Sequence, residues 1–153
     1  MSQVTFNSHA EFEKYIGQEI GVSDYLQITQ EQINKFAEAT LDHQWIHTDP
    51  VRAKDGPFGS TIAHGYLTIS VMPYLWEQIA KFNNIKMQVN YGVEGLRFGQ
   101  AVKVNDEVCL RAKLKDLKNL RGISKTELDV RLEIKDQRKP AFTSTMIFLY
   151  HFE

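Results

Sequence analysis

Four residues that could exchange protons or bind a metal lie close together in residues 40–50, which read TLDHQWIHTDP. They are Asp42, His43, His47 and Asp49. An imidazole exchanges protons near neutral pH because its ordinary pKa is about 6.5, and a nearby carboxylate can share that task. Asp42 and His47, with the apolar Trp45 and Ile46 between them, therefore form a candidate acid/base pair that could activate a water molecule.

The same segment allows two other interpretations. His43 and His47 are four positions apart, and two histidines with one carboxylate from Asp42 or Asp49 are a known pattern for zinc or iron. Pro50 indicates that a helix has already ended, and the His-Glu-x-x-His motif is missing, so we expect no metal. The segment could also be a polar loop whose side chains lie in solvent.

His64 and Gly65 stand at the start of the most apolar segment, residues 64–82. The N-terminus of a helix offers free N–H groups and a partial positive charge, and a glycine lets a ligand approach the backbone closely. A substrate carbonyl placed there would be polarised as in an oxyanion hole. His64 itself more simply shapes the start of the helix.

Three helices are predicted in the first half of the chain, at residues 9–16, 29–40 and 64–82. The second has a capping-box pattern, Thr29 followed by Gln32, and an apolar stripe of Ile33, Phe36 and Ala37. The third is apolar on nearly all sides, which is typical of a buried helix, and Pro73 should kink it. We expect Met72, Tyr74 and Trp76 of this helix to lie in the core.

The second half of the chain predicts antiparallel strands at residues 85–92, 94–102, 106–120, 122–136 and 139–152. Leu128, Val130, Leu132 and Ile134 alternate strictly with polar residues, and residues 118–122 and 136–140 are typical of hairpin turns. The predicted class is α+β: an antiparallel sheet, connected as a meander, wrapped around one long buried helix. The edges of such a small sheet need cover, which a second copy could supply.

Composition limits the other possibilities. The 153 residues suggest one domain, residues 1–153. A net charge of −1 argues against binding nucleic acid or an anionic membrane through bulk electrostatics. The single Cys109 fits a reducing compartment. Neither a signal-peptide core nor a run of about 18 apolar residues is present, so we expect a cytoplasmic protein.

Residues 36–70, FAEATLDHQWIHTDPVRAKDGPFGSTIAHGYLTIS, resemble the MaoC-like dehydratases, also called the (R)-specific enoyl-CoA hydratase or hydratase 2 family. The matching residues are Asp42, Gln44, Ile46, His47, Asp49-Pro50, Phe58-Gly59 and His64-Gly65. Residues 96–108 are similar to a family strand, with Asn105-Asp106 in place of Gly-Asp. The stretches DHQWIH and FGSTIAHGYLTIS are most similar to the nodulation protein N branch.

The resemblance implies a hot dog fold, usually a homodimer, and a lyase that takes part in fatty acid metabolism. The reaction would be reversible syn addition of water to a trans-2-enoyl thioester, giving the (R)-3-hydroxyacyl thioester. Asp42 and His47 match the catalytic dyad, with Asp42 most simply the base, and the Gly65 N–H matches the group that holds the thioester carbonyl. Further residues that could line the site are Gln44, Trp45, His64 and Ser70. The substrate would be an acyl-CoA or acyl-carrier thioester, with coenzyme A part of the substrate and no separate cofactor.

Two other functions stay open. A hot dog acyl-thioesterase would hydrolyse the same thioester instead of hydrating its alkene. A non-catalytic acyl-thioester-binding module would bind it without turnover. An intact Asp42/His47 pair favours the hydratase over the binding module.

Overall fold

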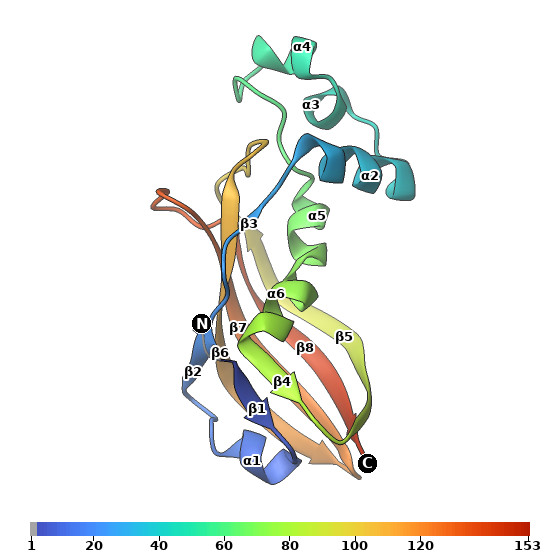
Figure 1. Cartoon of the computed structure of the whole chain (residues 1–153), viewed down its shortest axis with the longest axis vertical. Helices are drawn as coiled ribbons and strands as arrows, with labels where there is room; N and C mark the ends of the chain where they lie inside the picture. The colour runs from blue at the N-terminus through green and yellow to red at the C-terminus, as the bar shows by residue number, and fades with distance from the viewer. Residues whose placement is uncertain (1–2) are drawn as a thin grey trace.

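The computed structural model describes residues 3–153. A curved antiparallel sheet wraps around a helical segment, and three further helices lie beyond one end of the sheet (Figure 1). The strand order is β2-β6-β7-β8-β5, and β3 pairs with β6 beside β2. The strands are β2 (Glu19–Val22), β3 (Leu26–Gln27), β5 (Ile85–Phe98), β6 (Glu107–Leu120), β7 (Ile123–Ile134) and β8 (Phe142–Phe152). The predicted α+β class, an antiparallel sheet around a buried helical segment, is confirmed.

The central segment is two short helices, α5 (Gly65–Ser70) and α6 (Met72–Ile79), that meet at Val71. Sequence analysis predicted one helix over residues 64–82, which is correct in place but wrong in detail. Pro73 lies in the first turn of α6, where a missing N–H removes no helical hydrogen bond. The segment also ends earlier than predicted, because residues 80–82 form strand β4 (Ala80–Phe82).

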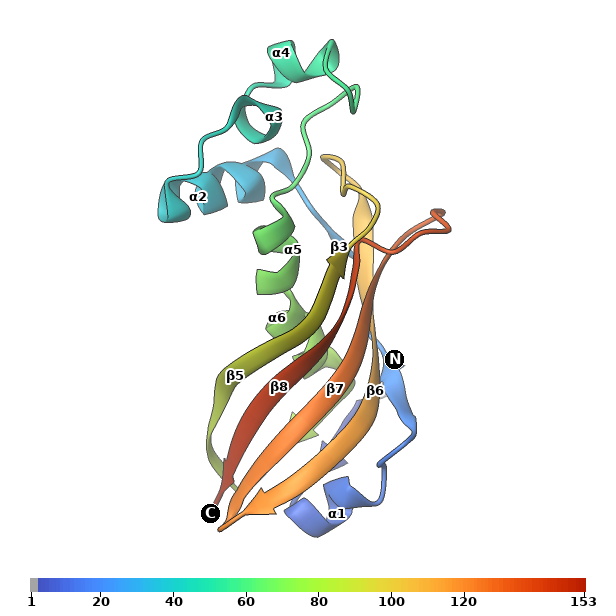
Figure 2. The same ribbon diagram turned by 180° about the vertical axis from the view of Figure 1, so that it is seen from behind.

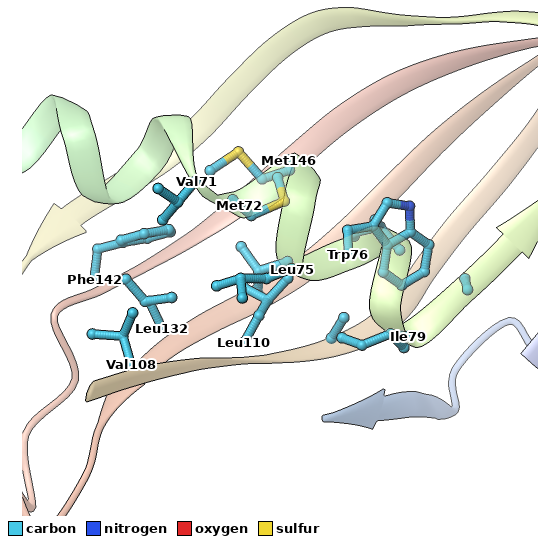
Figure 3. Close-up of a cluster of buried hydrophobic side chains, with 14 of the residues drawn as sticks. Val71, Met72, Leu75, Trp76, Ile79, Val108, Leu110, Leu132, Phe142 and Met146 are labelled. Atoms are coloured by element: carbon cyan, nitrogen blue, oxygen red, sulfur yellow. The ribbon is translucent and has the colours of Figure 1, made fainter. Parts of the chain in front are cut away.

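One side of this helical segment faces the concave side of the sheet, and the other is open. Leu75 and Trp76 are almost fully buried, whereas Tyr66 is 70% exposed and Tyr74 is 55% exposed. The prediction that Tyr74 lies in the core is therefore wrong, and Met72 and Trp76 are placed as expected. Figure 3 shows the apolar contact, which contains Val71, Met72, Leu75, Trp76, Ile79, Val108, Leu110, Leu132, Phe142 and Met146.

β7 confirms the predicted alternation, with every second residue from Ser124 to Ile134 buried. The turn between β6 and β7 has Arg121 at φ 56° and Gly122 at φ 92°. Two consecutive residues with positive φ are typical of the tight hairpin turns that match the strand twist. Residues 118–122 therefore form the hairpin that the sequence indicated.

The predicted meander is wrong at its first two strands, as strand β5 shows. The strands predicted at residues 85–92 and 94–102 are one 14-residue strand that ends at Phe98 and pairs with β8. A register shift between Glu94 and Arg97 contains Gly95 at φ 58°, so a bulge bends the strand without ending it. β5 therefore lies at the end of the sheet next to β8, far from β6 (Figure 2).

The N-terminal part covers the other end of the sheet. Helix α1 (His9–Glu13) is shorter than the predicted residues 9–16, and its cap is Ser8, whose side chain accepts from the Glu11 N–H. Strand β1 (Val4–Phe6) pairs in parallel with β4. Strands β1 to β4 were not predicted from the sequence, because each has only two to four residues.

The three helices beyond the end of the sheet are α2 (Gln30–Thr40), α3 (Trp45–Thr48) and α4 (Pro50–Lys54). Thr29 caps α2 as predicted, since its hydroxyl accepts from the Gln32 N–H at 3.2 Å. Among residues 3–153, none of the helices has the length and apolar character needed to cross a membrane.

Candidate active site

Asp42 follows the end of helix α2, and His47 lies within helix α3, so the two residues enter the site from different elements. α2 ends at Leu41, which adopts a left-handed conformation with φ 66°, so the chain turns sharply just before Asp42. His47 lies in helix α3, whereas the sequence indicated a loop through residue 47. The next helix begins at Pro50, and the Asp49 carboxylate caps it by accepting from the Arg52 N–H at 3.0 Å. A proline in the first helical turn therefore begins a helix here, whereas sequence analysis took Pro50 only as a sign that a helix had ended.

The His47 ring is fixed in one orientation. It is 6% exposed, and its Nδ1 lies 2.7 Å from the main-chain oxygen of Ile62. A carbonyl oxygen only accepts, so Nδ1 carries the proton and Nε2 of the neutral ring is free to accept. Gln30 holds the main chain of His47 through a 2.7 Å bond to its carbonyl oxygen, and Thr61 fixes Gln30 by donating to its side-chain oxygen.

The surroundings of His47 favour its neutral form. Burial lowers the pKa of His47, which is the largest effect, while the hydrogen bond to Ile62 opposes it. The neighbouring His64 lowers the pKa further, and the Asp42 carboxylate raises it. The net pKa is below the ordinary value of 6.5, so Nε2 of His47 is a free base at neutral pH.

Asp42, His47 and His64 converge. Each offers one ring nitrogen or carboxylate oxygen, and these three atoms lie within 4.8 Å of one another. Asp42 is exposed, and within residues 3–153 its carboxylate makes only a long contact, 3.4 Å, with the Gln44 N–H. The carboxylate and the His47 ring are thus close enough to share one water molecule.

His64 contacts both members of the pair. Its Nε2 lies 3.0 Å from the main-chain oxygen of Asp42, and its ring stacks on His47 with centroids 3.9 Å apart and planes 23° apart. A metal ion lies close to the plane of each imidazole that binds it, and two nearly parallel stacked rings cannot both satisfy this. The arrangement therefore suits proton transfer better than a shared metal ion.

A cavity of about 300 Å³ contains the pair, and its lining residues are Asp42, His47, His64, Gly65, Tyr66 and Phe98. A second cavity of about 270 Å³ shares Gly65 and Phe98 and has mainly apolar walls, among them Ile62, Val102 and Ala141. A Cβ atom at Gly65 would lie 2.9 Å from the Phe98 ring. A side chain at position 65 would therefore displace the Phe98 ring, which packs closely on the start of α5.

The structure brings four of the residues singled out from the sequence into this cavity: Asp42, His47, His64 and Gly65. Gln44 and Trp45 begin α3 outside the cavity, and Trp45 packs under the Arg52 guanidinium at 4.2 Å. Ser70 lines a different cavity and donates to the Tyr66 carbonyl oxygen.

Sequence reasoning missed Tyr66 and Phe98 as lining residues. Phe98 lies within residues 96–108, which are similar to a family strand. This similarity was the signal that could have identified Phe98 as a residue of the site.

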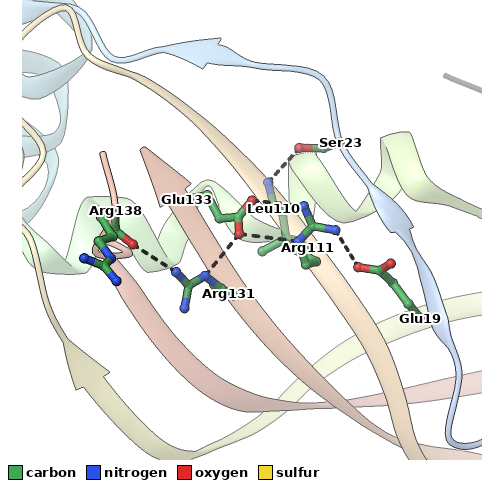
Figure 4. Close-up of polar contacts among 7 residues, drawn as sticks. All are labelled: Glu19, Ser23, Leu110, Arg111, Arg131, Glu133 and Arg138. Carbon is green, nitrogen blue, oxygen red and sulfur yellow. Dashed lines mark hydrogen bonds and ion pairs between the residues drawn. The ribbon is translucent and has the colours of Figure 1, made fainter. Parts of the chain in front are cut away.

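A hollow of about 680 Å³ on the outer face of the sheet has a different character, because it is lined mainly by charged and polar residues. Arg111 pairs with Glu19 at 2.7 Å and with Glu133 at 3.3 Å, and Arg131 pairs with Glu133 at 3.1 Å (Figure 4). These hydrogen bonds raise the pKa of Arg111. Charges that neutralise one another in this way on an open surface are typical of a solvated face.

Comparison with known proteins gives matches along most of the chain. A family model described as a MaoC like domain matches residues 11–135. Over 147 residues the chain is 40% identical to 3-hydroxyacyl-thioester dehydratase Z of Mycobacterium tuberculosis, covering 95% of this chain and 97% of that protein. Over 140 residues it is 40% identical to Nodulation protein N of Rhizobium meliloti, covering 90% and 87%.

Among solved structures, an R-hydratase from Pseudomonas aeruginosa in the unliganded form is similar, with a TM-score of 0.74 at 21% identity. The match covers 99% of this chain and 90% of that one. An (R)-hydratase from A. caviae is similar with a TM-score of 0.70 at 24% identity, covering 87% and 94%. These likenesses confirm the hot dog fold that the sequence indicated.

Proposed function

Because this chain belongs to the MaoC-like dehydratase family and is a hydro-lyase of the hydratase and dehydratase type, we propose that it adds water reversibly to a trans-2-enoyl thioester and forms the (R)-3-hydroxyacyl thioester. The observation that carries this proposal is the pair of proton acceptors in one cavity. Nε2 of His47 is unprotonated because Nδ1 donates to Ile62, and a carboxylate oxygen of Asp42 lies within 4.8 Å of a nitrogen of the His47 ring.

In the proposed reaction a water molecule donates one O–H to Asp42 and the other to His47. The dyad takes a proton from the water as the oxygen bonds to C3, and it delivers a proton to C2. The C2=C3 double bond becomes single, and the net change is addition of one water. The hydroxyl group and the proton reach the double bond from the same side, so the addition is syn. The two groups act on the same water molecule, so the base is the dyad rather than one residue.

We propose that the Gly65 N–H binds the thioester carbonyl oxygen and stabilises the negative charge that develops there in the transition state. Gly65 borders the cavity that contains the dyad, and among residues 3–153 no acceptor is recorded for its N–H. The neighbouring apolar cavity also borders Gly65 and Phe98, and we propose that it accepts an apolar part of the substrate.

The reaction needs no redox cofactor, since hydration changes no overall oxidation state, and the dyad supplies the proton transfer without a metal. Coenzyme A or an acyl carrier would be part of the substrate. A cytoplasmic location fits a protein that works on such thioesters and carries one buried, unpaired cysteine, Cys109.

A homodimer is part of this proposal. β5 has a partner on one side only in the strand order, and it carries the exposed apolar residues Met87, Tyr91 and Val93 beside Phe98. A second copy that pairs with β5 would cover this edge and lie close to the cavity at Phe98. Light scattering should give about twice 17.7 kDa. A monomer that keeps full activity at micromolar concentration would contradict this part.

The test is an assay with crotonyl-CoA and a series of longer trans-2-enoyl-CoA substrates. We expect the absorbance of the conjugated alkene to fall without release of free thiol, and the product to feed an (R)-specific but not an (S)-specific dehydrogenase. Thiol release at the rate of substrate loss would support the thioesterase instead. Binding of crotonyl-CoA without turnover would support the binding module, and an (S) product would contradict the proposed geometry.

A further inference from the structure

We propose that His64 is a positioning residue for the dyad: it fixes Asp42 through a main-chain hydrogen bond and fixes the plane of the His47 ring by stacking on it. This inference rests on the proposed hydration reaction and deepens it. His64 lies 22 residues after Asp42 in the sequence, and it immediately precedes the glycine proposed to bind the thioester oxygen. It therefore connects the dyad to the start of α5.

The first contact locates Asp42. The segment that carries Asp42 leaves α2 at Leu41 with reversed backbone geometry, and the Asp42 side chain itself is exposed. Its carboxylate is held only by the long contact to the Gln44 N–H. The 3.0 Å bond from Nε2 of His64 to the Asp42 carbonyl oxygen ties this segment to the buried part of the site. Without that bond, the carboxylate would lose its fixed distance from His47.

The second contact fixes the His47 ring. The bond from Nδ1 of His47 to Ile62 fixes one atom of the ring but still allows the plane to tilt about that bond. The His64 ring stacks on one face of the His47 ring, with the ring centroids 3.9 Å apart. The Phe36 ring in turn contacts the His64 ring, with centroids 4.9 Å apart. The stack therefore sets the direction in which Nε2 of His47 points.

The tautomer of His64 follows from the same hydrogen bond. Nε2 must carry a proton because its partner is a carbonyl oxygen, so Nδ1 of the neutral ring is an acceptor. This Nδ1 is buried, and no partner is recorded for it within residues 3–153. The titratable groups that line the same cavity as His64 are Asp42, His47 and Tyr66, and the ring of Phe36 of α2, which contacts His64, is apolar. His64 also lowers the pKa of His47, so its loss should raise that pKa.

The test uses variants that separate the two contacts. His64→Phe keeps a flat ring for the stack but has no donor, His64→Gln keeps a donor but has no ring, and His64→Ala has neither. His43→Phe is the matched control, because His43 is an exposed histidine next to Asp42. Circular dichroism and thermal unfolding identify any variant that does not fold.

We expect kcat for crotonyl-CoA to fall about 10- to 100-fold in His64→Phe and in His64→Gln, the loss expected when a reacting group is displaced by about 1 Å. KM should change little, because the substrate contacts remain. The acid limb of the pH profile should move to higher pH in each variant, which a purely structural role for His64 would not produce. His43→Phe should behave as the unaltered protein.

The outcomes distinguish this inference from the function on which it rests. If the unaltered protein hydrates crotonyl-CoA and folded His64→Phe and His64→Gln do so at the same rate with the same acid limb, the positioning role is wrong and the hydratase stands. If the unaltered protein has no hydratase activity, an NMR titration of His47 decides the inference. An unchanged His47 titration in both folded variants would then overturn it, and a shift to higher pH would support it.

Discussion

Nδ1 of His47 donates a 2.7 Å hydrogen bond to the main-chain oxygen of Ile62, which leaves Nε2 as an acceptor in a buried ring that lines one cavity with Asp42. Residues 15 positions apart are thus joined across the end of the sheet. Because the acceptor is a main-chain oxygen, it fixes the tautomer of His47 whatever side chain stands at position 62. The geometry of the dyad therefore depends on the position of the segment that contains Ile62.

The lowered pKa of His47 makes stability depend on pH. Since burial disfavours the protonated ring, the unfolded chain, with an ordinary pKa of about 6.5, binds this proton more readily than the folded protein. The contribution of His47 to stability is therefore complete above about pH 6.5 and falls as the pH decreases toward the folded-state value. Urea unfolding at pH 7.5 and pH 5.5 should show this loss, and His47→Gln should reduce it. An equal loss in the variant would show that other groups cause it.

Gly65→Ala should impair catalysis through Phe98. The added Cβ would lie 2.9 Å from two carbons of the Phe98 ring, which must move, and the ring is exposed enough to do so. We expect kcat/KM to fall by about 10- to 100-fold, since the displaced ring borders both cavities.

Phe98→Leu alone is the control for this variant. In the Gly65→Ala/Phe98→Leu double variant the smaller side chain should restore part of the loss. Additive losses in the double variant would mean that contact with Phe98 is not the cause.

The two sides of α6 should respond differently to truncation. Leu75 is fully buried, so Leu75→Ala should lower the free energy of unfolding by about 2–5 kcal/mol. Tyr74 is 55% exposed, so Tyr74→Ala should change the free energy of unfolding of the isolated chain by no more than about 0.5 kcal/mol. Chemical denaturation measures both. A large loss from Tyr74→Ala would indicate that this surface is covered, as a homodimer would cover it.

Local sequence patterns predicted those structural features that depend on contacts among a few neighbouring residues. The alternation around Val130, the cap at Thr29 and the glycine at the start of α5 each depend on contacts within one or two turns or on one face of a strand. Residue types and spacing made Asp42 and His47 one candidate pair among three interpretations, and resemblance to a family selected it. Their convergence itself depends on the position of Ile62, which the local sequence does not show.

The remaining features depend on pairing between distant segments. Residues 85–98 carry no local signal that this strand pairs with β8, because strand pairing depends on the packing of the whole sheet. Tyr74 was assigned to the core because its neighbours are apolar, yet the sheet covers only one side of α6. Phe98 enters the site because β5 ends beside Gly65, which local sequence does not reveal.

The most direct measurement of the dyad is the turnover of crotonyl-CoA by Asp42→Asn, His47→Gln and the double variant, each checked for folding. Asn keeps the shape of Asp but removes the base, and Gln removes the imidazole. Each single change should lower kcat by about 10²–10⁴, and the double variant should be little worse than the worse single variant, because both groups act on one water. Turnover equal to that of the unaltered protein in either folded single variant would contradict the proposed dyad.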